Sequence, residues 1–307
     1  MDIFLQQLIN GLILGSIYAL VALGYTMVYG ILELINFAHG EIVMMGAMVA
    51  LTVINALAGT ALPGPLIVVM GAMAAIPACM VLGFAIERVA YRPLRHAPRL
   101  APLITAIGMS IVLQNTAMLI WGKQYISMPP VFKATQFNIA GATISDLQIF
   151  IFLLSCALMA GLLVLVNRTR LGRAMRATAQ NKEVAGLMGV DINTIISMTF
   201  LIGSALAAVA GVMVTSYYGL AHYYMGFLLG LKAVTAAVLG GIGNLGGAML
   251  GGLLLGIIES MGAGYIGDLT GGFLGSNYQD IFAFFVLITV LVFRPAGLMG
   301  ERVGERA

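Results

Sequence analysis

Polar residues inside or beside long apolar segments are the parts of this sequence that could do chemistry. Asn36, His39 and Glu41 lie between two apolar stretches, and Gln114 and Asn115 lie within another. Ionisable groups at membrane depth are costly, so each one is by default a functional hypothesis. We therefore predict that these residues face or brace a path through a membrane, where they replace part of the hydration of a polar solute.

Each of these polar residues also has a structural interpretation. Glu41 stands at the start of an apolar helix, where a negative charge favours the N-terminal dipole, so this region could be an interfacial turn. Gln114 and Asn115, with Thr105 and Ser110 earlier in the same segment, could make hydrogen bonds between helices. The sequence leaves both interpretations open.

The apolar stretch 223–266 carries two further features. Lys232 and Glu259 could be partners, although Lys232 could equally extend toward a membrane surface. The run from Gly240 to Gly247 interrupts the stretch. Such a break is either non-helical backbone at a transport site or a tight hairpin between two short spans. We favour the hairpin, because the orientation of the flanking segments requires a turn there.

No pattern of a catalytic or metal centre accompanies these residues. The chain has 3 histidines, His39, His96 and His222, and no cysteine pair at metal-ligand spacing. No nucleophile-elbow motif is present. The basic segments lack the interleaved aromatic residues of a nucleic-acid-binding surface. The sequence therefore predicts no enzyme activity, no metal, no cofactor and no nucleic-acid partner.

Composition places the chain in a membrane. Charged residues make up 9%, hydrophobic residues 61%, and the mean hydropathy is +1.02, whereas soluble domains carry about 25% charged residues. Residues 3–32 and 42–86 contain no Asp, Glu, Lys or Arg, and about 20 apolar helical residues cross a bilayer core. Residues 1–307 are predicted to form a single all-α domain, a polytopic helical bundle of about 8–10 transmembrane helices with one or two broken or re-entrant segments.

A literal count of the apolar segments gives nine spans. A break at Pro63-Gly64-Pro65 separates the second span from the third. The predicted spans are 3–29, 42–61, 66–86, 100–121, 147–166, 194–217, one on each side of the Gly-rich run, and 281–293.

The distribution of positive charge predicts the orientation of the spans. Most arginines fall in residues 87–99 and 167–193, and the positive-inside rule places both segments in the cytoplasm. The tail with Arg294, Arg302 and Arg306 is cytoplasmic by the same rule. Residues 122–146 and the N-terminus then lie outside.

The loop of about residues 168–193 is the most informative polar region. Its apolar residues alternate with charged ones at roughly helical spacing, which predicts a short amphipathic helix or helix pair at the membrane surface. The alternative is an ordinary basic loop that fixes topology. We favour a docking element for a cytoplasmic partner. The residues predicted to carry that contact are Arg173, Arg176, Glu183, Ala185 and Gly189.

This loop resembles a known family of transporters. Residues 183–189, Glu-Val-Ala-Gly-Leu-Met-Gly, match the Glu-x-Ala-x-x-x-Gly core by which permeases of ATP-binding-cassette importers grip their ATPases; the longer Ile-x-Leu-Pro tail is absent. Further stretches resemble permeases for branched-chain amino acids of the LivH type, in order from about Asn10 to Gly300. They are 35–41, 87–95, 108–110, 171–177 and 236–243.

The resemblance implies a machine of several chains in the bacterial inner membrane. Such a permease pairs with a homologous second permease, two cytoplasmic ATP-binding subunits and a periplasmic amino-acid-binding protein, and carries leucine, isoleucine or valine inward. The sequence holds no Gly-x-x-x-x-Gly-Lys-[Ser/Thr] motif, which agrees with ATP hydrolysis by partner subunits.

Other functions stay open at this level. Permeases of similar pattern carry urea, short amides or other amino acids. A different class, a passive channel or ion-coupled carrier, would use Glu41 or Glu259 as its ion-sensing group. A membrane-embedded enzyme has no motif in its support.

Overall fold

A computed structural model describes residues 2–95, 97–98, 100–131, 135–139, 141–270, 278–294 and 296–300. Several residues of the segments used in the sequence argument lie outside the described ranges. They are His96 and Arg99 in the first basic segment, and Arg302 and Arg306 in the C-terminal tail.

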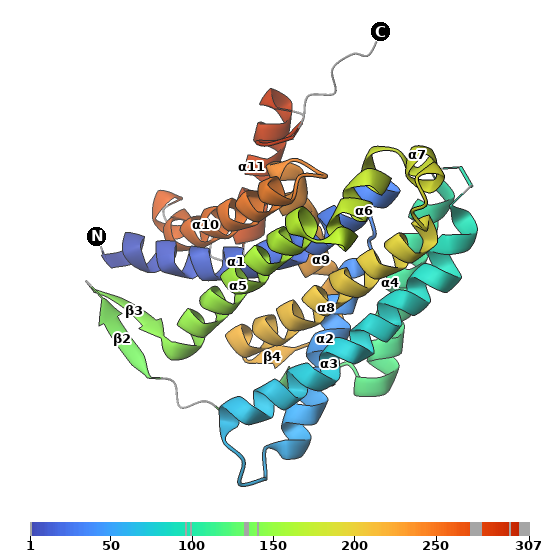
Figure 1. Ribbon diagram of the computed structural model, residues 1–307. Helices are drawn as coiled ribbons and strands as arrows, with labels where there is room; N and C mark the ends of the chain where they lie inside the picture. The colour runs from blue at the N-terminus through green and yellow to red at the C-terminus, as the bar shows by residue number, and fades with distance from the viewer. Residues whose placement is uncertain are drawn as a thin grey trace. The chain divides into compact units, whose positions relative to one another are not determined.

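The described chain is almost entirely helical, which confirms the predicted all-α class (Figure 1). The helices are α1 (Asp2–Leu32), α2 (His39–Leu57), α3 (Gly64–Ile86), α4 (Leu100–Trp121), α5 (Asp146–Arg168), α6 (Arg170–Gln180), α7 (Lys182–Leu187), α8 (Ile192–Tyr218), α9 (Met225–Gly240), α10 (Leu245–Leu269) and α11 (Gln279–Phe293). A π-helical turn, η1 (Glu87–Tyr91), and a 3-10 turn, η2 (Arg92–Leu94), follow α3. Four short strands are β1 (Ile126–Ser127), β2 (Gln136–Ile139), β3 (Ala142–Ser145) and β4 (Leu220–Ala221).

The apolar segments predicted as spans are helices. Among the described residues, 7 helices are long and apolar enough to cross a membrane, and Met225–Gly240 and Phe284–Phe293 are shorter apolar helices. The predicted hairpin within 223–266 is present, because α9 ends at Gly240 and α10 begins at Leu245. Gly241 and Gly243 have positive φ angles of 111° and 92°, a backbone conformation that suits glycine.

The polar loop after α5 forms the predicted helix pair, α6 and α7. Side-chain caps fix where each helix begins. Thr169 Oγ1 accepts a hydrogen bond from the Gly172 amide of α6 at 3.0 Å, and Asn181 Oδ1 accepts one from the Val184 amide of α7 at 3.0 Å. Caps of this kind satisfy amides that the first helical turn leaves unpaired.

The chain divides into two compact units, and each is described by itself. One unit comprises residues 27–133 and 158–231. In it, α2, α3 and α8 pack on one another (Figure 1). Glycines bring these helices close, because a Cβ at Gly46 would lie 2.7 Å from Ala208 Cα and one at Gly211 would lie 2.2 Å from Val43 O. Strand β1 pairs with β4 antiparallel in this unit.

The other unit comprises residues 1–26, 134–157 and 232–307. Its part of α1 packs on α10 through glycines of both helices, and α10 packs on α11. A Cβ at Gly256 would lie 2.2 Å from the Gly15 nitrogen, and one at Gly252 would lie 2.4 Å from Ala19 Cα. Small residues allow this close backbone approach between helices in a membrane.

The glycine contacts of α10 give a direct test of this packing. In Gly256→Ala the new methyl group overlaps the Gly15 backbone, so the free energy of unfolding should fall by about 1–3 kcal/mol. Gly161→Ala is the matched control, because nothing lies within 4 Å of a Cβ there. Thermal unfolding of both purified variants in detergent measures the difference. Equal stability of the two would contradict the packing of α1 on α10.

Candidate functional site

Helix α6 is held against the end of α5 by an arginine. The Arg176 guanidinium donates to the Val166 carbonyl and, at 3.2 Å, to Asn167 Oδ1. A cation that binds the last carbonyls of a helix also complements the dipole of that helix. Arg173 is exposed on the same helix. The predicted pair of arginines therefore separates into one that positions α6 and one that is available to solvent or a partner.

Helix α7 presents apolar side chains outward. Ala185 is buried, whereas Leu187 is 87% exposed, Met188 81% and Val184 53%. Glu183 is also exposed. Exposed apolar groups beside charged ones are typical of a contact surface rather than of a folded core.

Gly189 ends α7 through its backbone. Its φ angle is +85°, and its amide donates to Gly186 O at 3.0 Å while the Val190 amide donates to Ala185 O at 3.0 Å. These two bonds form a Schellman motif, in which the residue after the C-cap takes the left-handed conformation that glycine adopts most easily. Ala185 and Gly189 of the Glu-x-Ala-x-x-x-Gly core thus have packing and backbone roles.

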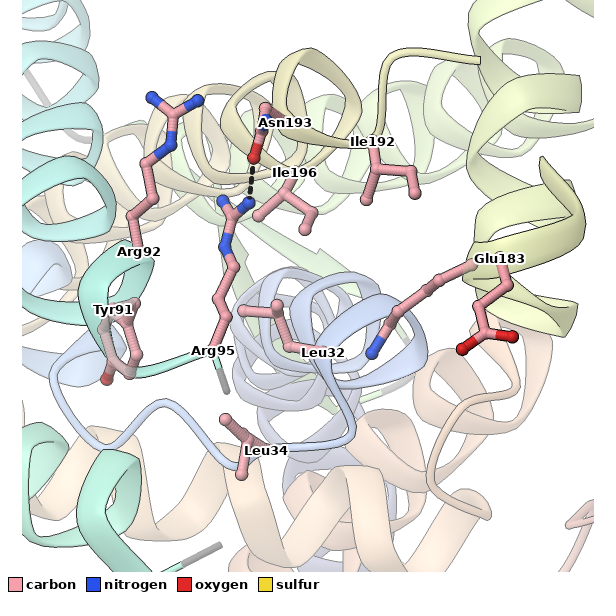
Figure 2. Close-up of a pocket in the computed structure, with 10 residues that line it drawn as sticks. Leu32, Leu34, Tyr91, Arg92, Arg95, Glu183, Ile192, Asn193 and Ile196 are labelled. Atoms are coloured by element: carbon pink, nitrogen blue, oxygen red, sulfur yellow. Dashed lines mark hydrogen bonds between the residues drawn. The ribbon is translucent and has the colours of Figure 1, made fainter. Parts of the chain in front are cut away.

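A buried ionic cluster lies beside the helix pair in the same unit. Glu87 is fully buried, pairs with Arg95 and accepts a hydrogen bond from Ser197 Oγ at 2.8 Å. Arg95 also donates to Asn193 Oδ1 (Figure 2). The sequence analysis used residues 87–99 to predict orientation and missed this cluster. The adjacent charged residues Glu87 and Arg88, directly after an apolar span, were the signal that could have indicated a buried ion pair.

The structure brings some of the predicted path residues together. Glu41 is fully buried in the first turn of α2, and its Oε1 accepts hydrogen bonds from Ser110 Oγ at 2.9 Å and Gln114 Nε2 at 2.7 Å. Both donors lie on α4, so the predicted hydrogen bonds between helices are present. Asn115 is exposed and donates to Ile111 O of its own helix at 2.8 Å. It does not join Gln114 in this cluster.

Asn36 and His39 lie at the entry to α2. Both side chains are 2% exposed. Asn36 Oδ1 accepts hydrogen bonds from Tyr91 Oη at 2.7 Å and from the Ala38 amide at 3.1 Å, which shapes the turn before the helix. The turn interpretation therefore describes Asn36, although the burial of Asn36 and His39 differs from an interfacial loop.

The unit that comprises residues 1–26, 134–157 and 232–307 contains a buried ion cluster around Lys232. Lys232 Nζ lies 2.7 Å from Glu259 Oε1, 2.8 Å from Asp280 Oδ1 and 3.3 Å from Tyr18 Oη. The side chains of Lys232 and Glu259 are 12% and 1% exposed. Lys232 and Glu259 are therefore partners, one of the two predicted alternatives. Sequence reasoning missed Asp280 and Tyr18, because their separations along the chain carry no periodic signal.

Apolar helices of this length, with a few buried polar groups held between them, define a polytopic membrane protein. The family described as the permease component of the branched-chain amino acid transport system matches residues 7–291, and the chain belongs to that family. It is a multi-pass permease of the inner membrane.

Three curated relatives extend over nearly the whole chain. The high-affinity branched-chain amino acid transport system permease protein BraD of Pseudomonas aeruginosa is 49% identical over 99% of this chain and 98% of its own length. LivH of Escherichia coli K12 is 45% identical over 99% of this chain and 97% of its own. A probable LivH of Methanocaldococcus jannaschii is 28% identical over 97% and 94%.

The Lys232 cluster predicts a specific pattern of stability. Lys232→Met leaves two carboxylates without their shared cation, and breaking a buried pair costs about 3–5 kcal/mol. Adding Glu259→Met should restore most of the loss, since the deepest unpaired charge is then gone. Thermal unfolding in detergent measures both variants, with Lys123→Met, at an exposed lysine, as the control. A double variant as unstable as Lys232→Met would contradict the pairing.

Proposed function

We propose that this chain forms half of the transmembrane pathway of an ATP-binding-cassette importer that moves leucine, isoleucine or valine into the cell. A homologous second permease would complete the pathway, two cytoplasmic subunits would hydrolyse ATP, and a periplasmic binding protein would deliver the amino acid. The observation that carries the proposal is the 49% and 45% identity, over nearly the full chain, to permeases named for branched-chain amino acid transport.

Helices α6 and α7 are proposed as the contact with the ATPase subunits. Leu187 and Met188 offer apolar surface at the C-terminal end of α7, and Arg173 and Glu183 add exposed charges. Burying one leucine side chain is worth about 1.5–3 kcal/mol, so a few such residues suffice for a specific contact. Ala185 and Gly189 then act indirectly, because they fix the shape of α7.

Glu41 and Gln114 are the best supported candidates for the translocation path. They are polar, they meet between α2 and α4, and Glu41 Oε2 makes no hydrogen bond within the described part of the chain. A zwitterion that crosses a membrane needs such groups in place of water. Asn36 and His39 would support the entry to α2, and Asn115 is the weakest candidate because it is exposed.

The function is tested in vesicles that contain the permease pair and its ATPases. With leucine-loaded binding protein outside and ATP inside, labelled leucine should accumulate, and unlabelled isoleucine or valine should compete while urea should not. Accumulation that continues without ATP and collapses with an ion gradient would instead favour an ion-coupled carrier. Competition by urea or a short amide would contradict the assigned cargo.

Gly189 tests the role of α7 in coupling. In Gly189→Val a β-branched residue must take a φ of +85°, which costs roughly 1–2 kcal/mol or more and distorts the end of α7. ATP hydrolysis should then continue while leucine uptake per ATP falls several-fold, in the same vesicles. The control is Gly186→Ala, where the new Cβ would meet Ile192 Cδ1 at an ordinary 3.5 Å. Normal uptake by Gly189→Val would remove α7 from the coupling path.

A further inference from the structure

A pocket of about 620 Å³ opens beside α7, within a single unit of the chain. Its volume lies in the range of roughly 300–1,000 Å³ that is usual for small-molecule sites. The walls come from the end of α1, from η1 and η2, from α7 and from the start of α8. The lining residues are Leu32, Leu34, Tyr91, Arg92, Arg95, Lys182, Glu183, Ile192, Asn193 and Ile196.

The pocket combines an apolar wall with charges of both signs. Four aliphatic side chains line it, and Figure 2 shows Arg92 and Arg95 near one side and Glu183 on the opposite side. Leu32, Leu34 and Ile192 are half-buried and Ile196 is buried. Such a lining would accept a ligand with a short aliphatic chain, an anionic group and a cationic group.

The lining carries more cations than its carboxylate, Glu183, can neutralise. Glu87, which is not among the lining residues, pairs with Arg95. Arg92 and Lys182 form no ion pair under 4 Å with any carboxylate in the ranges that the structure describes. Arg92 acts on the exposed Asp191 from farther away, and a hydrogen bond from Thr194 is the main cause that lowers the pKa of Asp191.

One donor of the lining residue Arg95 lacks an acceptor. Arg95 Nε is buried and makes no hydrogen bond to the described residues, although the rest of the guanidinium is bound to Glu87 and Asn193. A buried donor left without an acceptor costs about 1–3 kcal/mol, so this arginine is held at an energetic cost beside the pocket. An anionic group in the pocket would neutralise the surplus positive charge of the lining.

We propose that this pocket binds a free aliphatic α-amino acid from the cytoplasm. The carboxylate would be held by the cations of the lining, the ammonium group by Glu183, and the side chain by the leucines and isoleucines. That the amino acid is leucine, isoleucine or valine rests on the proposed function. The pocket is then a site for the imported product, distinct from the path residues around Glu41.

A ligand bound in the pocket would restrain the position of α7. The ligand connects η2, through Arg92, with α7, through Glu183, so it restrains the element proposed to contact the ATPases. A ligand that stabilises one position of α7 shifts the transporter toward that state by its differential affinity. Imported amino acid would therefore slow its own import.

The test uses vesicles with the ATPase subunits facing outward and leucine-loaded binding protein enclosed. Leucine added outside meets the cytoplasmic face, and the rate of ATP hydrolysis is measured. Hydrolysis should fall as leucine rises. The analogue 4-methylpentanoate lacks the ammonium group of leucine and isoamylamine lacks the carboxylate, so each should inhibit at least about tenfold more weakly. If 4-methylpentanoate or inorganic phosphate inhibits as well as leucine, the pocket is an anion site and the assignment to an amino acid is wrong.

Arg92→Gln removes one charged partner and should raise the leucine concentration for half-inhibition about tenfold. Arg92→Lys keeps the charge and should shift it less. Arg88→Gln, at an exposed arginine of the same segment that does not line the pocket, is the matched control and should behave as the parent chain.

Three results separate the possible failures. Hydrolysis that is stimulated by enclosed, loaded binding protein but insensitive to added leucine would overturn the product site and leave the proposed function intact. Hydrolysis that loaded binding protein never stimulates would count against the proposed function itself. Loss of the ATPase subunits from Arg92→Gln, without any leucine effect in the parent, would mean that an acidic group of the partner fills the pocket.

Discussion

Pairing of buried charge is the constraint on which the polar part of this structure depends. In an apolar surrounding an unpaired charge loses several kcal/mol of hydration, so each buried ionisable group must find a partner. Glu87 meets Arg95, and Lys232 meets Glu259 and Asp280. Glu41 has hydrogen-bond donors on α4 but no cation among the described residues. Glu41 is therefore the buried carboxylate with the fewest compensating charges among these, which supports its proposed place on the translocation path.

Close helix packing is the second condition, because paired groups must be held at fixed distances. Glycines at the contacts of α1 with α10 and of α2 with α8 bring backbones together where a methyl group would overlap. The hydrophobic effect contributes little to the association of helices within lipid. Dispersion contacts between close backbones therefore supply much of the free energy of association. The abundance of glycine, 39 residues, thus follows from packing in a membrane, although glycine weakens helices in water.

The sequence predicted the helices well and the contacts between them poorly, for a physical reason. Spans, the turn after Gly240 and the helix pair α6 and α7 depend on local hydrophobicity, glycine and caps, which adjacent residues encode. The cluster of Tyr18, Lys232 and Asp280 joins residues far apart in the chain, and no local pattern records such a meeting. Gln114 and Asn115 show the same limit: neighbours in sequence, they face different surroundings because a helix turns about 100° per residue.

The missing tail of the Glu-x-Ala-x-x-x-Gly motif gains a structural meaning from the turn after α7. Val190 and Asp191 are all that separate the Schellman turn from α8, and Asp191 caps α8 by accepting hydrogen bonds from the Asn193 amide and Thr194 Oγ1. A link this short, fixed at both ends by hydrogen bonds, leaves α7 little freedom relative to α8. Since α8 packs on α2 and α3, a force applied to α7 would reach the helix that carries Glu41 through continuous, closely packed backbone. For the coupling that we propose, a rigid connection matters more than a long motif, and the capped link between Gly189 and Ile192 is such a connection.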